Sequence, residues 1–398
     1  MNQLASVGDD SPAPRICAEL PFALAVSIAF LVVPAPSLDA QAYQSEEHAF
    51  QVTTVAEGLE HPWSAAFLPN GDILVTERPG RLRLIQDGQV QPEPIGGVPD
   101  VFANGQGGLL DVVLHPDFAE NQLVYLSFSK PSRGGAVTGV IRGRFDGTSL
   151  TDVEDIFEGD NFSDGGNHFG SRLVFDQEGY LFITVGDRAA PPRLGTGEGH
   201  PAQLLSTHAG TVVRLHDDGR VPSDNPFVGS DGSQPEIWSY GHRSLQGLAL
   251  DPATGRLWES EHGPQGGDEL NLIEPSRNYG WPIVGYGVNY GGAVIHDGSE
   301  REGMEQPVHY WVPSIATSGL AIYDGDAFPA WRGNAFLGAL RGELLSRVVI
   351  EAGGSIHEER LLTDFGERIR DVRNGPDGFL YLLTDNPQGR LLRIEPTP

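Results

Sequence analysis

Short runs of alternating apolar and polar residues dominate this 398-residue chain, and each run follows a tight turn. The turn is built on Pro-Asp-Gly, Pro-Asn-Gly or a close relative. Proline fixes φ, the Asp or Asn side chain bonds the local backbone, and glycine takes a positive φ. The β-branched and aromatic residues that follow suit a pleated, half-buried surface. This phrase occurs six times, at residues 68–76, 115–127, 175–184, 251–258, 331–338 and 375–384.

Six copies, spaced irregularly at roughly 45 to 80 residues, predict an all-β fold, a six-bladed β-propeller with loop insertions at one face. No long segment repeats its apolar residues with the helical period of 3.6, which disfavours an α/β fold. Propellers bind ligands at one mouth of the central channel. We expect the longest insertions to build that mouth, at residues 186–240, 262–311 and 130–167.

An apolar stretch precedes the first of these strands. Residues 21–33 (PFALAVSIAFLVV) have the length of a signal-peptide core and are too short to span a bilayer comfortably. Arg15 supplies a positive charge before it, and residues 40–42 (AQA) offer small side chains for cleavage. We therefore expect residues 1–42 to be a cleaved signal peptide, residues 43–398 to form one propeller domain, and the protein to be periplasmic or secreted. An uncleaved membrane anchor is the alternative.

Composition excludes several classes of function. The chain carries 54 acidic and 26 basic residues, a net charge of −28, which would repel nucleic acid and anionic membranes. We expect no nucleic-acid partner and no stable membrane insertion after cleavage. Cys17 is the one cysteine and lies before the expected cut, so neither a disulfide framework nor a thiol nucleophile is predicted. Rossmann-type Gly-x-Gly-x-x-Gly and esterase-type Gly-x-Ser-x-Gly motifs are absent as well.

Two neighbouring stretches concentrate residues suited to ligand chemistry, 241–248 (GHRSLQGL) and 261–269 (EHGPQGGDE). Glycines let backbone groups approach a ligand closely, because no Cβ stands in the way. Carbonyl and carboxylate oxygens suit a hard cation such as Ca²⁺, and the Arg243 guanidinium suits an anion. This mixture predicts a site that binds a metal together with an anionic small molecule. A glycine-rich loop with an ordinary salt bridge is the alternative.

A second anion site is predicted near the C-terminus. Arg368 and Arg370 alternate about Ile369, so both side chains lie on the same face of one strand. Two guanidiniums on one face repel each other unless an anion lies between them, and arginine binds carboxylates in bidentate fashion. The anion could belong to a ligand. It could also be Asp371 or an acid on a neighbouring blade.

Several motifs, taken in order, resemble those of one known family. Residues 105–111 (GQGGLLD), 167–173 (NHFGSRL), 278–282 (NYGWP) and 368–372 (RIRDV) are similar to segments of the soluble glucose/sorbosone dehydrogenases. The closest resemblance is to the periplasmic aldose sugar dehydrogenases that use pyrroloquinoline quinone (PQQ), and it covers residues 50–396. It implies oxidation of an aldose at C1 to a lactone, with hydride passed to PQQ and Ca²⁺ beside it. A soluble carrier or artificial dye would then accept the electrons.

The resemblance also implies roles for individual residues. His168 would be the general base, and Arg243 would stabilise charge on the reduced cofactor. The resemblance implies that PQQ is bound by Gln106, Arg243, Ser244, Ser314, Arg341, Arg368 and Arg370. The backbone carbonyls of Gly263 and Pro264 would bind Ca²⁺, while Asp268 and Glu269 would support that site or form a separate structural Ca²⁺ site. The chain departs from the family pattern at Asn167, where some glucose-oxidising members have an acid, and at Ser244, where many relatives have Asn.

Two other functions fit a propeller of this kind. A Ca²⁺-dependent sugar lactonase would need side-chain acids at its axial metal, whereas this chain offers a Gly-Pro carbonyl turn and many arginines. A non-enzymatic propeller would keep the scaffold for binding alone. The sequence makes no prediction of the preferred aldose, the natural electron acceptor or the oligomeric state.

Overall fold

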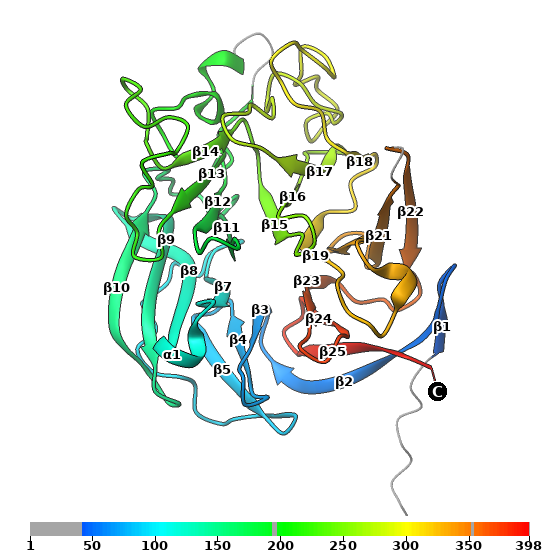
Figure 1. The fold of residues 1–398 in the computed structure, drawn as a ribbon. Coiled ribbons are helices and arrows are strands. Elements are labelled where there is room, and N and C mark those ends of the chain that lie inside the picture. Colours follow the sequence, from blue (N-terminus) through cyan, green and yellow to red (C-terminus); the bar gives the residue numbers. More distant parts are fainter. Residues whose placement is uncertain (1–41, 193–196, 352–353, 398) are drawn as a thin grey trace, which may run out of the picture. The chain divides into compact units, whose positions relative to one another are not determined.

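A computed structural model describes residues 42–192, 197–351 and 354–397, which belong to one compact unit, Ala40–Pro398 (Figure 1). The expected signal peptide lies outside the described residues except for Ala42. In the part of the chain that is described, no helix is long and apolar enough to cross a membrane. The helices there are α1 (Phe118–Asn121) and three short 3₁₀ helices at Gly197–Gly199, Pro201–Gln203 and Pro329–Trp331.

The described strands form six antiparallel sheets, which confirms the predicted six-bladed β-propeller. Blade 1 contains β3 (Pro62–Phe67), β4 (Ile73–Glu77), β5 (Arg81–Gln86) and β6 (Gln89–Val90). Blade 2 contains β7 (Leu109–Leu114), β8 (Leu123–Ser132), β9 (Gly135–Phe145) and β10 (Leu150–Glu158). Blade 3 contains β11 (Gly170–Phe175), β12 (Leu181–Val185), β13 (Thr211–Leu215) and β14 (Ile237–Tyr240).

The remaining blades follow the same order along the chain. Blade 4 contains β15 (Leu245–Leu250), β16 (Leu257–Glu261), β17 (Asp268–Ile273) and β18 (His309–Trp311). Blade 5 contains β19 (Thr317–Ile322), β20 (Ala335–Ala339), β21 (Leu345–Ile350) and β22 (Ile356–Leu361). Blade 6 contains β23 (Ile369–Asn374), β24 (Leu380–Thr384), β25 (Gly389–Pro396), β2 (Ala49–Leu59) and β1 (Ala42–Gln44).

The blades close into a ring around a central axis (Figure 1). Each first strand contacts the first strand of the next blade, from β3 and β7 round to β23 and β3. The ring is closed within blade 6, because β2 from the start of the domain pairs with β25 from its end, with Phe50 opposite Pro396 and Leu59 opposite Gly389. Closure leaves the starts of all six first strands at one end of the ring.

The repeated phrase marks the same turn in every blade, between the first strand and the second. In blade 1 the Leu68 N–H donates to the Asp72 carbonyl at 2.8 Å. The corresponding turn in blade 6 is closed by the Gly375 N–H, which donates to the Phe379 carbonyl at 2.8 Å. The number of sequence repeats therefore equals the number of blades, because each blade contains one such turn.

The predicted insertions are shorter than expected, because blade strands lie within them. Residues 186–240 contain β13 and β14, residues 262–311 contain β17 and β18, and most of 130–167 belongs to β8, β9 and β10. Short strands such as the three-residue β18 give too few alternating positions to be recognised in sequence. The described connecting segments near the starts of the first strands are 159–169, 186–192, 197–210 and part of 274–308.

Charged side chains pair with each other between the first strands at the centre of the ring. Arg172 Nη1 lies 2.8 Å from Asp371 Oδ1, and Arg373 Nε lies 2.8 Å from Asp371 Oδ2. A second contact joins Arg373 Nη2 to Asp111 Oδ1 at 2.6 Å. Asp371 and Asp111 together therefore neutralise Arg172 and Arg373. This resolves one alternative left open by the sequence, because Asp371 is not the partner of Arg368 and Arg370.

Candidate active site

His168 lies on the segment that leads into β11 and has a φ of 53°. Few residues other than glycine adopt this backbone region, and those that do gather at functional sites. Its backbone N–H donates to Gln106 Oε1 at 2.8 Å. A Cβ on Gly186 would lie 2.2 Å from the His168 carbonyl oxygen, so only glycine permits this approach. The glycine-rich motifs thus bring the segments that carry His168 and Gln106 together.

A carboxylate and an indole hold the ring of His168. His168 Nδ1 lies 2.6 Å from Asp187 Oδ1, and Asp187 Oδ2 accepts a hydrogen bond from Trp281 Nε1 at 2.8 Å. The Asp187 backbone N–H donates to the Arg243 carbonyl at 2.9 Å, which places Arg243 beside the pair. With Nδ1 donating to a carboxylate, Nε2 is the ring nitrogen that keeps a free lone pair.

The electrostatics of this pair suit a general base. Burial lowers the pKa of His168, although the charge of Asp187 opposes the shift. Burial by itself would favour the protonated form of Asp187, but His168 and Arg243 lower its pKa on balance. At neutral pH the pair therefore consists of a neutral imidazole and an ionised carboxylate. The imidazole can accept a proton, and the carboxylate stabilises the imidazolium that results.

Arg243 lies over the turn that follows β16. Its Nη1 donates to the carbonyls of His262 at 2.9 Å and Gly263 at 2.8 Å, and its backbone N–H donates to Glu261 Oε2 at 2.5 Å. Its guanidinium carbon lies 5.2 Å from the centre of the Trp281 ring. Since a carbonyl oxygen has two lone pairs, the Gly263 carbonyl keeps a second position for another partner.

Three other predicted residues support this turn and its surroundings. Asp268 accepts from the backbone N–H groups of Gly263 at 3.0 Å and Ala316 at 2.7 Å, and from the Ser314 hydroxyl at 2.8 Å. Asp268 and Ser314 thus bind each other and fix the loop that carries Gly263. The Ser244 hydroxyl is buried and accepts from Gln246 Nε2 at 3.2 Å.

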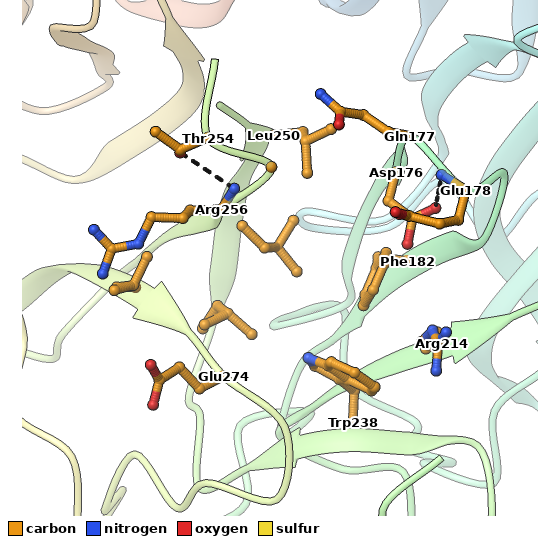
Figure 2. Close-up of a pocket in the computed structure, with 14 residues that line it drawn as sticks. Asp176, Gln177, Glu178, Phe182, Arg214, Trp238, Leu250, Thr254, Arg256 and Glu274 are labelled. Atoms are coloured by element: carbon orange, nitrogen blue, oxygen red, sulfur yellow. Dashed lines mark hydrogen bonds between the residues drawn. The ribbon is translucent and has the colours of Figure 1, made fainter. Parts of the chain in front are cut away.

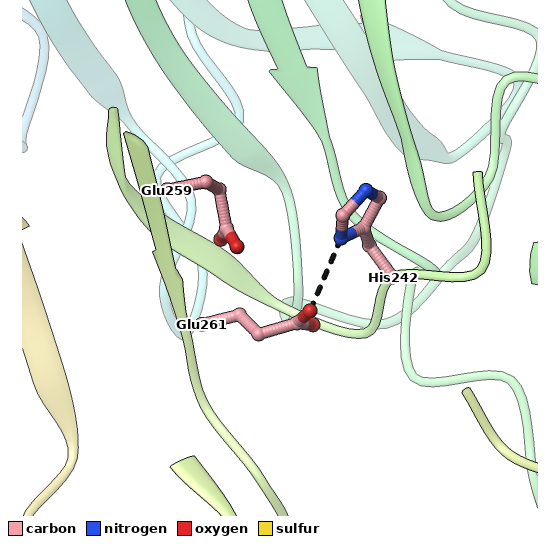
Figure 3. A group of neighbouring side chains, drawn as sticks. All are labelled: His242, Glu259 and Glu261. Carbon is pink, nitrogen blue, oxygen red and sulfur yellow. Dashed lines mark hydrogen bonds and ion pairs between the residues drawn. The ribbon is translucent and has the colours of Figure 1, made fainter. Parts of the chain in front are cut away.

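Next to this turn lies an acidic cluster, which we define as Glu259, Glu261, Glu269 and the side chains that join them, Asn271 and His242. Figure 3 shows His242, Glu259 and Glu261, whose ligand atoms all lie within 4.8 Å of one another. Asn271 Nδ2 donates to all three glutamates, at 3.2 to 3.4 Å. Glu259 Oε1 and Asn271 Oδ1 are buried without a hydrogen-bond partner.

Burial and the charge of Glu261 raise the pKa values of Glu259 and Glu269 well above the usual range. Buried carboxylates that share a site need protons or a cation to compensate their charge. The donor set is one imidazole, carboxylate oxygens and an amide oxygen without a partner. The acidic cluster therefore has the chemistry of a site for a hard divalent cation.

A cavity of about 520 Å³ opens at the starts of the first strands. Its walls include Gln106, Gln246 and His262, together with Arg368 and Arg370, and we call it the arginine-lined cavity. Burial and the charges of Arg243 and Arg370 lower the pKa of His262 to about 3, so this ring is neutral at neutral pH. His262 also belongs to the walls of a small neighbouring pocket formed with Arg243, Gly263 and Pro264. His262 therefore joins the arginine-lined cavity to the turn near the acidic cluster.

An acid does lie between Arg368, which directly precedes β23, and Arg370 of β23, but it is neither Asp371 nor a residue of a neighbouring blade. Asp385, which directly follows β24, accepts from Arg368 Nη2 at 2.9 Å and from Arg370 Nη2 at 3.1 Å. Arg370 Nη1 also donates to Gln246 Oε1 at 3.2 Å. The side chain of Arg368 remains 45% exposed, so this guanidinium can still reach a ligand.

The structure brings together Gln106, His168 and Arg243 through Asp187, and it places Arg368 and Arg370 in the same cavity as Gln106. Arg341 is different, because it is exposed and its neighbour Leu340, not Arg341 itself, lines the cavity. Sequence reasoning missed Asp187 and Asp385. One signal could have found them: an acid also stands near the end of the second strand in blades 1 and 4, as Glu77 and Glu261.

A second cavity, of about 450 Å³, lies between blades 3 and 4 (Figure 2). Its walls include Asp176 and Glu178 of the turn after β11, and Thr254 and Arg256 of the turn after β15. His168 precedes β11, whereas Asp176 follows it. A six-residue strand spans about 20 Å, so this cavity lies at the opposite end of the blades from His168. It contains none of the residues predicted to act on a ligand.

Comparison with known proteins gives consistent matches along the chain. Residues 59–393 match the Glucose / Sorbosone dehydrogenase family. The aldose sugar dehydrogenase YliI of Escherichia coli (strain K12) is 46% identical over 351 residues, which cover 87% of this chain and 92% of that protein. The apo form of the soluble aldose sugar dehydrogenase from Escherichia coli has a TM-score of 0.82 at 46% identity, over 87% of this chain and 100% of that one. The PQQ-bound aldose sugar dehydrogenase from Streptomyces coelicolor has a TM-score of 0.69 at 30% identity, over 87% and 98%.

Proposed function

This chain belongs to the Glucose / Sorbosone dehydrogenase family, as its motifs predicted, and on that premise we propose that it is a PQQ-dependent dehydrogenase that oxidises aldose sugars at C1 to lactones. The observation that carries the proposal is the His168–Asp187 pair. It lies in contact with Gln106, at the edge of the arginine-lined cavity. A neutral, oriented imidazole beside an anion-binding cavity suits removal of a hydroxyl proton next to a bound anionic cofactor.

The residues of the cavity fit PQQ, which carries three carboxylates. In a chain with a net charge of −28, the wall of this cavity presents Arg78, Arg368 and Arg370 against the single carboxylate Asp385. We assign cofactor binding to Gln106, Arg368 and Arg370, with Arg243 and Ser244 on the adjoining loop. Ser314 and Arg341 are assigned to cofactor binding by their resemblance to the family alone. When bound, PQQ would accept the hydride that leaves C1.

The protein side chains would handle the proton and the orientation. His168 Nε2 would take the proton of the C1 hydroxyl as the C1–H bond breaks and a lactone carbonyl forms. Asp187 would hold the ring and stabilise its positive charge, and Trp281 would keep Asp187 in place through its indole N–H. The Arg243 guanidinium would stabilise negative charge at the edge of the cavity.

Ca²⁺ is the cation that the donor oxygens favour. The backbone carbonyls of Gly263 and Pro264 would hold one ion, with Asp268 fixing the loop. There the ion would act as a Lewis acid toward the carbonyl that accepts hydride. Glu269, with Glu259 and Glu261, would form a separate structural site, which the unpartnered oxygen of Glu259 supports.

The cellular setting is proposed on the same premise. We infer that residues 1–42 are a signal peptide, that residues 43–398 are the catalytic propeller, and that the protein works in the periplasm or outside the cell. Its reaction needs a soluble or artificial electron acceptor to regenerate the cofactor. The apolar run at 21–33 supports this view.

The test replaces the proposed base. His168→Ala should lower sugar-dependent dye reduction by about a hundredfold to ten-thousandfold, which is the contribution typical of a general base. PQQ binding should stay unchanged, as measured by equilibrium dialysis. His357→Ala is the matched control, because His357 is 50% exposed on β22, the last strand of blade 5, and pairs with Glu46 at the surface. Full turnover by His168→Ala would refute the assignment of His168 as the general base. A wild-type protein that binds no PQQ would refute the proposed PQQ-dependent dehydrogenase activity.

A further inference from the structure

The arginine-lined cavity contains more positive charge than the two predicted arginines supply. Arg78, which directly follows β4 in blade 1, belongs to its wall together with Arg368 and Arg370 of blade 6. The charge of Arg78 lowers the pKa of Arg370, after burial, which is the larger cause. Three arginines from two blades therefore line one cavity.

One carboxylate compensates this charge, and it is already fully engaged. Asp385 Oδ2 accepts from Arg368 and Arg370, and Asp385 Oδ1 lies 3.1 Å from His61 Nδ1. Burial of Asp385 opposes its ionisation, but Arg370, His61 and Arg368 together hold its pKa well below the usual range. With only 10% of its side chain exposed, Asp385 is a permanent part of the wall.

Arg78 has no such partner. Within the described residues, no carboxylate lies at ion-pair distance from it, and its side chain donates to the backbone carbonyl of Gly105. Two backbone contacts fix its position: its N–H donates to the His61 carbonyl at 3.1 Å, and its carbonyl accepts from Leu109 at 3.1 Å. A Cβ on Gly108 would lie 2.6 Å from Arg78 Cγ, so the glycine makes room for this side chain.

We propose that Arg78 is a third carboxylate-binding arginine of the cofactor site, and that Asp385 is a built-in counter-ion that compensates the charge of Arg368 and Arg370 until the cofactor binds. This inference rests on the proposed function, since it assigns residues toward PQQ. Asp385 keeps two like charges side by side in the free protein. The charge of Arg78 is not neutralised by a described carboxylate, and the paired N–H donors of its guanidinium can bind a carboxylate of the ligand in bidentate fashion.

The first experiment measures PQQ binding by equilibrium dialysis, without sugar and without turnover. Arg78→Gln keeps the stem that packs over Gly108 but removes the charge, so affinity should fall about tenfold or more at low salt, which equals about 1.4 kcal/mol. The loss should shrink at high salt, because salt screens the missing charge. Arg220→Gln is the control, because it makes the same charge change on a side chain that is 74% exposed between β13 and β14. It should bind PQQ like the wild type.

The second variant, Asp385→Asn, tests the counter-ion. Without its partner carboxylate, the Arg368–Arg370 pair repels itself, so the free protein should melt at a lower temperature. PQQ should bind more tightly, because the ligand no longer meets a negative charge and now relieves that repulsion. Melting curves with and without PQQ measure both effects.

The outcomes separate the two levels of the proposal. Wild-type protein that binds PQQ, with Arg78→Gln binding it equally well, would overturn the role of Arg78 and leave the dehydrogenase intact. Weaker PQQ binding by Asp385→Asn would overturn the counter-ion role. Wild-type protein that binds no PQQ would overturn both the inference and the function on which it rests.

Discussion

Two charged regions lie close together near the starts of the first strands, and they are opposite in kind. Around Asp385, the charges of Arg78, Arg368 and Arg370 outnumber one carboxylate, and the arginines face an open cavity of about 520 Å³. In the acidic cluster, three glutamates gather around Asn271, and among the described residues no arginine side chain bonds to them. The first region has positive charge in excess, and the second has negative charge in excess.

The excess charge of neither region stabilises the fold of the protein without a ligand. Burying like charges costs free energy unless a partner of the opposite sign is present. Here the excess charge of each region suits a ligand: an anion with several carboxylates in the cavity, and a hard cation in the acidic cluster. His262, on the wall of the cavity and next to Glu261, lies between them. The comparison therefore predicts two neighbouring but separate sites, one for an anion in the cavity and one for a cation in the acidic cluster.

The largest effect is expected from the acidic cluster. Glu259→Gln removes one of the carboxylates that would hold Ca²⁺, so Ca²⁺ affinity should fall about tenfold to a hundredfold, or about 1.4 to 2.7 kcal/mol. The rise in melting temperature on adding Ca²⁺ measures this loss. Glu358→Gln is the control, because Trp311 and Ser346 already bond that carboxylate. An unchanged Ca²⁺ effect in Glu259→Gln would rule out the acidic cluster as a cation site.

A smaller effect should follow in the cavity. Arg370→Gln removes one charged hydrogen-bond donor from an anion site where Arg78 and Arg368 remain, so PQQ affinity should fall by about 1.5 kcal/mol, at the low end for such a bond. The measurement is PQQ binding with Ca²⁺ absent, compared with Glu259→Gln under the same conditions. Glu259→Gln should bind PQQ like the wild type there. An equal loss of PQQ affinity in both variants would show that the two regions act as one site. It would contradict the distinction between an anion site and a cation site.

The smallest effect is expected at a third charged cluster, in which two acids already pair with a protonated histidine. This cluster shows how compensated charge behaves in the same protein. His208 Nδ1 lies 3.1 Å from Asp160 Oδ1, and His208 Nε2 lies 3.7 Å from Glu236 Oε2. Burial disfavours the charged ring, but these two acids raise the pKa of His208 to about 9. This contribution to stability, about 1 kcal/mol because solvent screens the 40% exposed Asp160 side chain, is fully present below about pH 6.5, the pKa of the unfolded state, and is lost as pH rises through 9.

Unfolding by urea between pH 6 and pH 10 measures this contribution. His208→Asn should be less stable than the wild type at pH 6, and the difference should narrow as the pH rises through 9. A difference that stays constant over this range would show that packing of the ring against Phe157, and not its charge, stabilises the segment. In that case the third cluster would not be an example of compensated charge.

Much of the site was predictable from the sequence because local chemistry revealed it. Gln106 and His168 were predicted from the resemblance of their glycine-rich segments to one family, and the close backbone approach of Gly105 and Gly166 brings these segments together. The alternation of Arg368 and Arg370 about Ile369 required an anion between them. The identity of that anion was not predictable, since Asp385 is 15 residues from Arg370 in sequence and meets it only through the pairing of β23 and β24.

The sequence by itself determined the number of blades, because every blade repeats one turn whose proline, Asp or Asn, and glycine are dictated by backbone geometry. It also determined which residue types bind anions and cations. Tertiary structure alone decided the partners: Asp187 for His168, Asp385 for the two arginines, Arg172 for Asp371, and three glutamates for one another. Strand pairing within a blade makes the contacts of Asp187, Asp385 and the glutamates, whereas ring closure makes the contact between Arg172 of blade 3 and Asp371 of blade 6. No local sequence pattern encodes either kind of contact.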